Sequence, residues 1–396
     1  MTLPLEGCRV LDLSQYLPGP LCSQILADFG AEVIKIEDVG GEQGRYLAPI
    51  MGKESSRFYT VNRNKKSLGV NLKSEEGRMI FKDLIRTADV LIEQFRPGAM
   101  EKLGLSYEVL KQENPALIHC AITGYGHTGP WRLTGGHDLN YLSITGITGL
   151  NGRADEPGLC ASQIADIGGG TLYGVIAVLL ALLARSQTGK GQFCDVAMAD
   201  GAFSMLCYTL GEWAGISKLP QRGGELLTGG YACYNVYRTQ DERYLSLGAI
   251  EPKFWEGFCQ RVDRPNFIPL HYNREKQSAM IQEIQGMIAA KTLEQWLQVF
   301  DGLDICLTPV LDLEEVTRHP QLNAREMIVK LENVNNTGKD VFLAGVPVKL
   351  SETPGVLNLK FPELGEHGVE LLHSLGYDQV RIDDLIAKKI IAAPPV

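Results

Sequence analysis

The sequence has no excess of positive charge to mark it as a partner of nucleic acid. Its 396 residues include 38 lysines and arginines against 47 acidic residues, which gives a net charge of −9 and a pI near 5.4. This balance leaves no electrostatic footprint for nucleic acid or for an anionic membrane. We therefore expect the partners of the chain to be small molecules or proteins.

The sequence also has no paired metal-binding or redox motif. Its nine cysteines are an odd number without a C-x-x-C pair, and its seven histidines form no H-x-x-H or H-x-H pair. The opening stretch MTLPLEGCRV lacks the charged and apolar regions of a signal peptide. We expect reduced thiols, a cytoplasmic location and no metal site.

One uncharged apolar run, residues 167–184, is long enough to suggest a membrane span. Glycines stand near its start, and Asp166 and Arg185 flank it. The chain is 44% hydrophobic and 21% charged, so it can build a sizeable core. We interpret the run as a buried core helix and predict no membrane partner.

Strand-like and helix-like segments alternate through the first half of the chain. Strands are predicted at 8–13, 32–36, 67–72, 90–92, 117–123 and 193–196. Helices are predicted at 20–29, 74–88, around 107–112, in the apolar run and at 199–213. Because such alternation produces a mainly parallel sheet with helices on both faces, the predicted fold class is α/β.

The character of the sequence changes at the glycine-rich stretch 220–230. A hairpin and further helices are predicted after it, from the segments 231–237, 244–248, 253–261 and 292–300. Thr292 and Gln295 have the spacing of a capping box. We predict a large domain interrupted by a smaller α+β domain, with the boundaries 1–224 (large), 225–325 (small) and 326–396 (large). The segment 307–311 would begin the return to the large domain.

A formal G-x-G-x-x-G motif follows a predicted strand, with its glycines at Gly124, Gly126 and Gly129. A dinucleotide site would need a helix to begin directly after this turn, but Pro130 and Trp131 follow instead. The sequence has no P-loop and no G-x-S-x-G elbow. We therefore expect no tightly bound cofactor.

Three polar residues remain as candidates for chemistry. Asp166 precedes the apolar helix, whose dipole and free N–H groups can hold a carboxylate. From the pattern alone, it is either an N-cap or a functional carboxylate. His137, in a polar stretch between elements, is either structural or catalytic. Glu251, just before a predicted helix, presents the same two alternatives as Asp166.

Several longer motifs resemble those of the family III CoA transferases and, among them, the α-methylacyl-CoA racemases. They are LPGP at 17–20, ADFGAEVIK at 27–35, DVLIEQFRPG at 89–98, EKLGL at 101–105, TGYGHTGP at 123–130, GHDLNY at 136–141, TGKGQ at 188–192, GG at 229–230 and GAIEP at 248–252. Because they occur in order along nearly the whole chain, the sequence is identified as a member of this family.

The resemblance implies a Rossmann-like large domain built from both chain ends, an inserted small domain and an interlocked homodimer. It also implies that coenzyme A, as part of the substrate, lies across the large domain. The implied CoA contacts are Val70, Asn71, Leu72, Lys73, Gln94, Phe95, Arg96, Lys102, Gly136, Asp138, Leu139, Asn140 and Tyr141. Asp38 stands where the racemases usually have an arginine, and Lys35, Arg45 or Arg63 are candidates to compensate.

Two chemistries in this family share the aspartate that matches Asp166. In the racemases, Asp166 and His137 would exchange the α-proton on opposite faces of an enolate, with Glu251 orienting the imidazole and N–H groups after Asp166 holding the enolate oxygen. In the transferases, Asp166 would be a nucleophile that becomes an aspartyl-CoA thioester.

His137 and Glu251 favour a racemase of 2-methyl-branched acyl-CoA thioesters, an isomerase of lipid metabolism. Ser162 departs from the racemases, which have an asparagine at this position, and the tail at 362–377 resembles the ending of the transferases. A CoA transferase acting between carboxylic acids is therefore the alternative. A non-catalytic acyl-CoA-binding subunit is a third interpretation.

Overall fold

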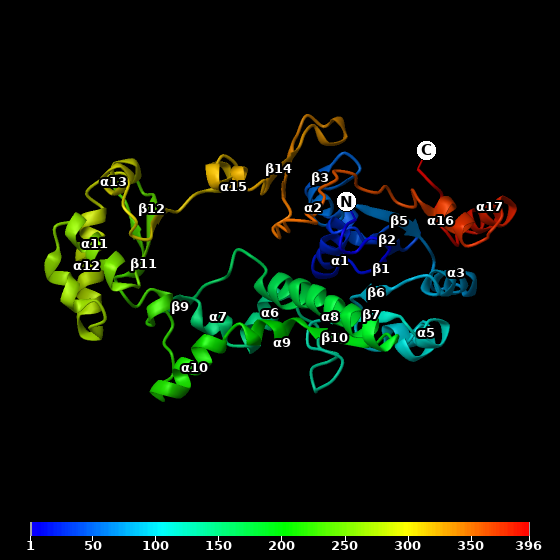
Figure 1. Cartoon of the computed structure of the whole chain (residues 1–396), viewed down its shortest axis with the longest axis horizontal. Coiled ribbons are helices and arrows are strands. Elements are labelled where there is room, and N and C mark those ends of the chain that lie inside the picture. The colour runs from blue at the N-terminus through cyan, green and yellow to red at the C-terminus, as the bar shows by residue number, and fades with distance from the viewer. Residues whose placement is uncertain (1, 396) are drawn as a thin grey trace. The chain divides into compact units, whose positions relative to one another are not determined.

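The structure is a computed structural model, and it describes residues 2–395. Its main feature is a six-stranded parallel sheet with the order β10-β7-β6-β1-β2-β5 (Figure 1). The strands are β1 (Arg9–Leu13), β2 (Glu32–Glu37), β5 (Lys65–Gly69), β6 (Val90–Glu93), β7 (Ile118–Thr123) and β10 (Phe193–Ala197). The predicted α/β class is confirmed. Five predicted strands agree to within one residue, whereas the strand predicted at 67–72 lies at Lys65–Gly69, where it pairs with β2.

Helices cover both faces of this sheet. One face carries α1 (Pro18–Asp28) and α8 (Tyr173–Thr188), and the other carries α3 (Glu75–Ile85), α5 (Tyr107–Glu113), α16 (Gly368–Ser374) and α17 (Gln379–Ala387). Leu11, Ile34 and Leu68 form one buried core with side chains of the second group of helices. Helices from the end of the chain therefore pack on strands from its beginning, as predicted.

Local sequence signals explain where these helices begin and end. Pro18 is the first residue of α1, where its missing N–H costs nothing, and Gly30 follows the helix in the left-handed region at φ +100°. The Ser74 hydroxyl accepts a hydrogen bond from the Gly77 N–H and caps α3. The chain therefore turns back to the sheet close to the predicted positions.

The order of the strands defines where a ligand should bind. From β1 the chain moves to β2 and β5 on one side, and then crosses to β6, β7 and β10 on the other. Ligands of open parallel sheets bind at the carboxyl ends of the strands, at the point where this direction reverses. The loops after β1, β6 and β7 should therefore carry the site.

The chain divides into two compact units, which are described separately. The first unit contains residues 2–144, 162–205 and 319–395. The second contains residues 145–161 and 206–318. The second unit therefore begins before the predicted boundary at 225. The helix α10 (Cys207–Ile216) accounts for part of this difference, because none of its residues is buried and it adds nothing to the core of the parallel sheet.

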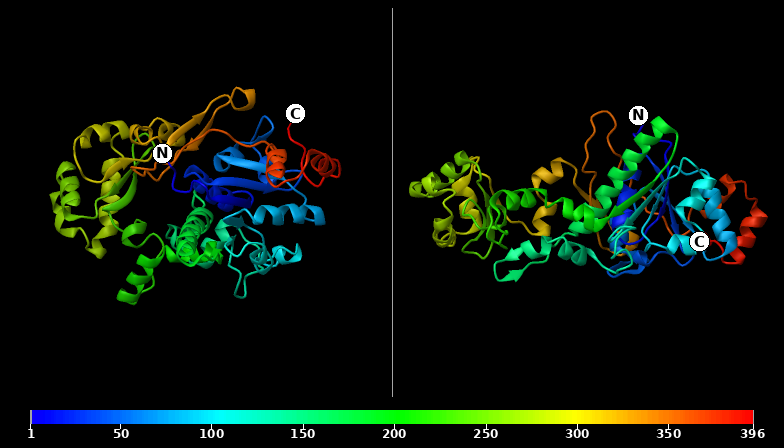
Figure 2. Two further views of the ribbon diagram at one scale, coloured as in Figure 1. Left: turned by 45° about the vertical axis from the view of Figure 1, so that its right-hand side comes forward. Right: turned by 90° about the horizontal axis from the view of Figure 1, so that it is seen from below.

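The second unit has its own antiparallel sheet and its own core. Its main elements are β11 (Tyr234–Arg238), β12 (Tyr244–Gly248), β13 (Leu307–Pro309), α11 (Pro252–Arg261), α12 (Gln277–Ile288) and α13 (Leu293–Phe300) (Figure 2). The predicted hairpin and the capping box of Thr292 and Gln295 are confirmed. The predicted return at 307–311 is wrong, because β13 pairs with β12 and stays in this unit.

Shorter elements connect these larger ones. The helices are α2 (Ser56–Val61), α4 (Ala99–Lys102), α6 (Asp138–Ile144), α7 (Ile147–Leu150), α9 (Met198–Ser204), α14 (Leu313–Thr317) and α15 (Pro320–Ala324). The strands are β3 (Ile50–Met51), β4 (Glu54–Ser55), β8 (Gly152–Arg153), β9 (Glu156–Pro157), β14 (Ile328–Leu331) and β15 (Val341–Ala344). The prediction of a single helix at 199–213 is wrong. A tight turn, in which the Met205 N–H donates to the Ala202 carbonyl oxygen, separates α9 from α10.

The apolar run forms a π-helical segment, Ile164–Leu172, followed by α8. The stretch Ile164–Thr188 is the one helix among residues 2–395 that is long and apolar enough to cross a membrane by length and composition. Gly174, Val178 and Ala181 are buried, with Gly174 against the sheet. The opposite face is exposed at Ile176, Leu179, Leu180 and Leu183. The expectation of a buried core helix is therefore correct for one face only.

Candidate active site

A cavity of about 780 Å³ lies at the carboxyl ends of β1, β6 and β7, where the strand order predicts a ligand. Its wall includes the β1–α1 loop, the segment after β6 and the loop that precedes α6. Seven of the predicted site residues line it, namely Gln94, Phe95, Arg96, Gly136, His137, Tyr141 and Asp166. The structure therefore brings both members of the predicted acid/base pair into one cavity.

Asp166 is the only carboxylate among the residues that line this cavity. Burial, and after it the carboxylate of Asp138, raises the pKa of Asp166 to about 6, while His137 opposes the shift. A carboxyl group with this pKa can both accept and release a proton near neutral pH.

The Asp166 side chain does not cap the helix that it precedes in the sequence. The Asp138 Oδ1 accepts the N–H groups of Ala165 and Asp166 at 2.7 and 3.0 Å, and the helix has no cap from its own side chains. The N-cap interpretation of Asp166 is therefore wrong. Asp138 thus occupies the N–H groups of Ala165 and Asp166, and the N–H of the next residue, Ile167, donates to the Gln163 carbonyl oxygen at 2.9 Å. The assignment of an enolate oxygen to N–H groups after Asp166 stays a prediction.

Close packing explains the glycines that follow Asp166. A Cβ atom on Gly169 would lie 2.3 Å from the backbone oxygen of Met198, and one on Gly201 would lie 2.5 Å from the Cα of Gly169. The π-helical segment and α9 therefore approach each other backbone to backbone. This contact fixes the segment that carries Asp166.

The raised pKa of Asp166 predicts a measurable cost in stability. Between pH 4 and 6 the folded protein holds this proton more tightly than the unfolded chain, so the free energy of unfolding falls as the pH rises through this range. We expect Asp166→Asn to raise the free energy of unfolding by about 1–2 kcal/mol at pH 8, after allowance for partial exposure, and to change it little at pH 4. Urea unfolding at both pH values measures the effect, with the exposed Asp155→Asn as control. An equal gain at pH 4 and pH 8 would contradict this explanation.

His137 is the last residue before α6, and its exposed side chain lines the cavity. Its backbone N–H donates to the Asn140 Oδ1 at 3.0 Å, and the Tyr141 hydroxyl donates to the Gly136 carbonyl oxygen at 2.5 Å. Burial, with Asp166 as the next cause, raises the pKa of Tyr141 to about 12. Asn140 and Tyr141, which were predicted as CoA contacts, thus hold the loop that presents His137.

Glu251 belongs to the second unit. It is exposed and precedes α11, whose first residue is Pro252, and its side chain makes no capping hydrogen bond. Glu251 is thus not a side-chain cap, and its pairing with His137 stays a prediction.

A second cavity of about 440 Å³ adjoins the first, and the two share Leu13, Gln15 and Phe95. The predicted CoA contacts Val70, Leu72 and Lys73 line it, together with Asp38. The remaining predicted contacts line neither cavity, and these are Asn71, Lys102, Asp138, Leu139 and Asn140. The two connected cavities therefore unite most of the predicted CoA residues along the sheet edge.

The prediction that a nearby cation compensates for Asp38 is wrong. Lys35, Arg45 and Arg63 are buried and paired with Glu42, Glu37 and Asp28, respectively. None of the three lines either cavity. They stabilise the large unit from within because buried cations need such partners.

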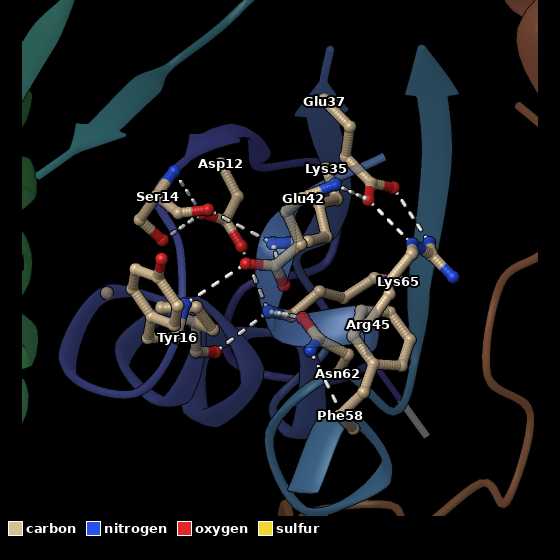
Figure 3. A network of polar contacts seen from close by, with 12 residues as sticks. Asp12, Ser14, Tyr16, Lys35, Glu37, Glu42, Arg45, Phe58, Asn62 and Lys65 are labelled. Carbon is tan, nitrogen blue, oxygen red and sulfur yellow. Dashed lines mark hydrogen bonds and ion pairs between the residues drawn. The ribbon is translucent and has the colours of Figure 1, made fainter. Parts of the chain in front are cut away.

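Buried charges hold the β1–α1 loop that forms one wall of the main cavity (Figure 3). Asp12 accepts the Ser14 N–H at 3.0 Å and the Lys65 ammonium at 2.9 Å. Glu42 accepts the N–H of Tyr16, which is in the left-handed region at φ +65°. Lys35 bridges Glu42 and the Ser14 carbonyl oxygen at 3.0 and 3.1 Å. The sequence analysis missed this network, although Asp12 and Lys35 each stand next to apolar residues of a predicted buried strand.

The G-x-G-x-x-G stretch serves as a loop anchor. The Gly126 N–H donates to the Thr123 hydroxyl, and the His127 N–H donates to the Asp195 carboxylate at 3.0 Å. No helix begins directly after Gly129, as predicted. Among residues 2–395, no group of three or more His, Cys, Asp or Glu side chains is arranged to hold a metal ion.

The profile of CoA-transferase family III matches residues 5–368. Alpha-methylacyl-CoA racemase of Homo sapiens is 35% identical over 402 residues, covering 100% of this chain and 99% of the relative. Acetyl-CoA:oxalate CoA-transferase of Acetobacter aceti is 33% identical, covering 93% and 95%. A solved CAIB/BAIF family protein from Brucella suis has a TM-score of 0.82 and 30% identity, covering 95% of this chain and all of that one.

Proposed function

The chain belongs to CoA-transferase family III, and from this premise we propose that it is a racemase of 2-methyl-branched acyl-CoA thioesters. One observation carries the proposal: His137 and Asp166 line the same cavity, and the pKa of Asp166 is raised to about 6. Inversion at an α-carbon needs one base on each face of a planar enolate, and each base must be able to return a proton. An imidazole and a carboxyl group of raised pKa meet this requirement.

In the proposed reaction, one of these two groups removes the α-proton and the other delivers a proton to the opposite face. Glu251 would orient the imidazole of His137. N–H groups after Asp166 would hold the enolate oxygen, as the resemblance implies. Gln94 lines the cavity and its Oε1 accepts the Gly19 N–H, so its Nε2 is a further candidate donor for this oxygen.

Coenzyme A would be the handle of the substrate, and we propose no tightly bound cofactor. Lys73 in the second cavity and Arg96 in the first offer positive charge to its phosphates. Binding energy from this remote part of the substrate would position the thioester against His137 and Asp166.

We propose a cytoplasmic homodimer in which the exposed apolar face of α8 is covered. Leu180 and Leu183 on this face are 61% and 59% exposed in the single chain. A contiguous apolar surface of this kind is typical of a contact between proteins. The molar mass in solution, measured by light scattering, tests the proposed dimer.

A CoA transferase is the second candidate, because a relative of this activity is 33% identical over nearly the full chain. Asp166 would attack the donor thioester, which expels CoA thiolate and leaves a mixed anhydride. The thiolate would then attack the aspartyl carbonyl, which releases the donor acid and forms the aspartyl-CoA thioester. The acceptor carboxylate would repeat these steps in reverse.

One experiment separates the two candidates. The protein is incubated in D2O with a 2-methylacyl-CoA and without an acceptor acid, and both the α-position and the intact protein mass are followed. The racemase predicts deuterium at the α-carbon, loss of stereochemical purity and no protein adduct. A CoA-sized mass increase at Asp166 that hydroxylamine removes, without exchange, would instead establish the transferase. If neither signal appeared, a non-catalytic acyl-CoA-binding subunit would be the better interpretation.

A further inference from the structure

The active-site cavity carries an excess of positive charge, although the net charge of the chain is −9. Arg57, Arg96 and Arg132 line the cavity, and Asp166 is the only carboxylate among its lining residues. With neutral histidine, the formal charge of the lining is 3 − 1 = +2. A concave surface with this excess concentrates anions.

These three arginines also lack partners of opposite charge. Among residues 2–395, no carboxylate oxygen lies within 4.0 Å of their guanidinium nitrogens. Arginines with structural roles in this chain differ, because Arg63 and Arg185 are each paired with an aspartate, at 2.7 and 2.8 Å. A guanidinium group binds a planar carboxylate or a phosphate through parallel hydrogen bonds. The free guanidinium groups therefore indicate an anionic ligand.

Two of these arginines line the cavity that the acyl end of the substrate must enter to reach Asp166. Arg57 on α2 and Arg132 in the loop before His137 line the cavity of Asp166, and neither lines the adjoining cavity of Lys73. Neither arginine is among the charges that shift the pKa of Asp166, which are those of Asp138 and His137. Arg57 and Arg132 are therefore available to a ligand rather than committed to the catalytic carboxyl group.

We propose that the acyl group carries a second, free carboxylate that Arg57 and Arg132 bind, so that the substrate is the CoA monothioester of a 2-methyl-branched dicarboxylic acid. The 2-methyl group in this inference rests on the proposed function, and the free carboxylate rests on the two arginines. Both arginines are exposed in the single chain, so an uncharged isostere would leave their guanidinium groups in water and would lose only the charge-assisted hydrogen bonds of the carboxylate.

Binding measurements test the proposal independently of turnover. The parent protein is Asp166→Asn, which should support neither proposed reaction. Its dissociation constants for 2-methylsuccinyl-CoA, for 2,4-dimethylpentanoyl-CoA and for CoA alone are measured by calorimetry. The first two esters differ in one group only. This group is a carboxylate in 2-methylsuccinyl-CoA and an isopropyl group of similar shape in 2,4-dimethylpentanoyl-CoA. The same measurements are made after the further changes Arg57→Met, Arg132→Met and, as a control outside both cavities, Arg325→Met.

The proposal predicts that the carboxylate ester binds about 10- to 100-fold more tightly than its isostere. Arg57→Met and Arg132→Met should each reduce this ratio about tenfold, while Arg325→Met leaves it unchanged. A ratio near one in the parent protein would overturn the proposal. It would also be overturned if Arg57→Met and Arg132→Met weakened the binding of CoA alone as strongly as the binding of 2-methylsuccinyl-CoA. The arginines would then hold phosphate rather than the acyl carboxylate.

Failure of the proposed function gives a different result. Deuterium exchange by the wild-type protein is followed with both esters at saturating concentration. If neither ester exchanged deuterium while the ratio of dissociation constants stayed high, the racemase proposal would be wrong and the carboxylate site would be supported. If both esters exchanged deuterium and the ratio of dissociation constants was near one, the racemase proposal would be supported and the carboxylate site would be wrong.

Discussion

His137→Ala is expected to lower the rate of racemisation about 1,000-fold, the typical contribution of a positioned acid or base. The variant should still exchange deuterium into the epimer whose α-proton faces Asp166, because one base can remove and return a proton on one face. The readouts are the rate of inversion, by chiral analysis of the released acid, and the rate of exchange, by mass spectrometry, for each epimer. Two separate rates are needed because inversion requires both groups and exchange requires one.

Two further variants make this prediction specific. Asp166→Asn should show the opposite preference, retaining exchange only in the epimer that faces His137. His373→Gln is the matched control, since His373 is an exposed histidine on α16 that lines neither cavity. Full inversion by His137→Ala would exclude the two-base mechanism. Loss of all exchange in Asp166→Asn, with none lost in His137→Ala, would favour Asp166 as a nucleophile.

The sequence predicts those parts of the fold that depend on neighbouring residues. The alternation of apolar segments locates five strands to within one residue, and Thr292 with Gln295 marks the start of α13. The resemblance to known motifs, rather than this alternation, identifies His137 and Asp166 as catalytic candidates. Both kinds of signal are contained in short stretches of chain.

Contacts between distant segments could not be predicted in this way. Asp138 caps the segment of Asp166 from 27 or 28 residues away, and no local pattern in the sequence marks this contact. The segment 307–311 was expected to begin the return to the large domain, but it pairs as β13 with β12, which is distant in the sequence. Which strands pair, and which side chains then meet, depends on the packing of the whole unit.

The buried charges on the strands are a further example of contacts between distant segments of the chain. Lys65 and Lys66 are adjacent on β5, and successive side chains of a strand point to opposite faces. The Lys65 side chain is 0% exposed, and its ammonium donates to Asp12, Asn62 and the Pro20 carbonyl oxygen. Burial lowers the pKa of Lys65 to about 8 against the opposing effect of Asp12. The Lys66 side chain is 30% exposed and pairs with Glu32 and Glu370.

Lys65→Met is expected to lower the free energy of unfolding of the first unit by about 3–5 kcal/mol, because it leaves the Asp12 carboxylate buried without its cation. Lys66→Met, the matched control, should cost less than about 1 kcal/mol, since its ion pairs are partly exposed to water. Hydrogen exchange of the β1 and β2 amides, measured by mass spectrometry, reports on this unit separately. Lys65→Met should accelerate globally limited exchange by a factor of about 100 or more.

A double variant distinguishes an unpaired charge from a simple packing defect. If the buried Asp12 carboxylate causes the loss, Asp12→Asn in the Lys65→Met background should restore part of the stability, because a neutral amide costs less to bury. If the loss came only from a poorly filled space, the second change would add to it. Equal losses in Lys65→Met and Lys66→Met would contradict the assignment, because burial is the main difference between these two lysines.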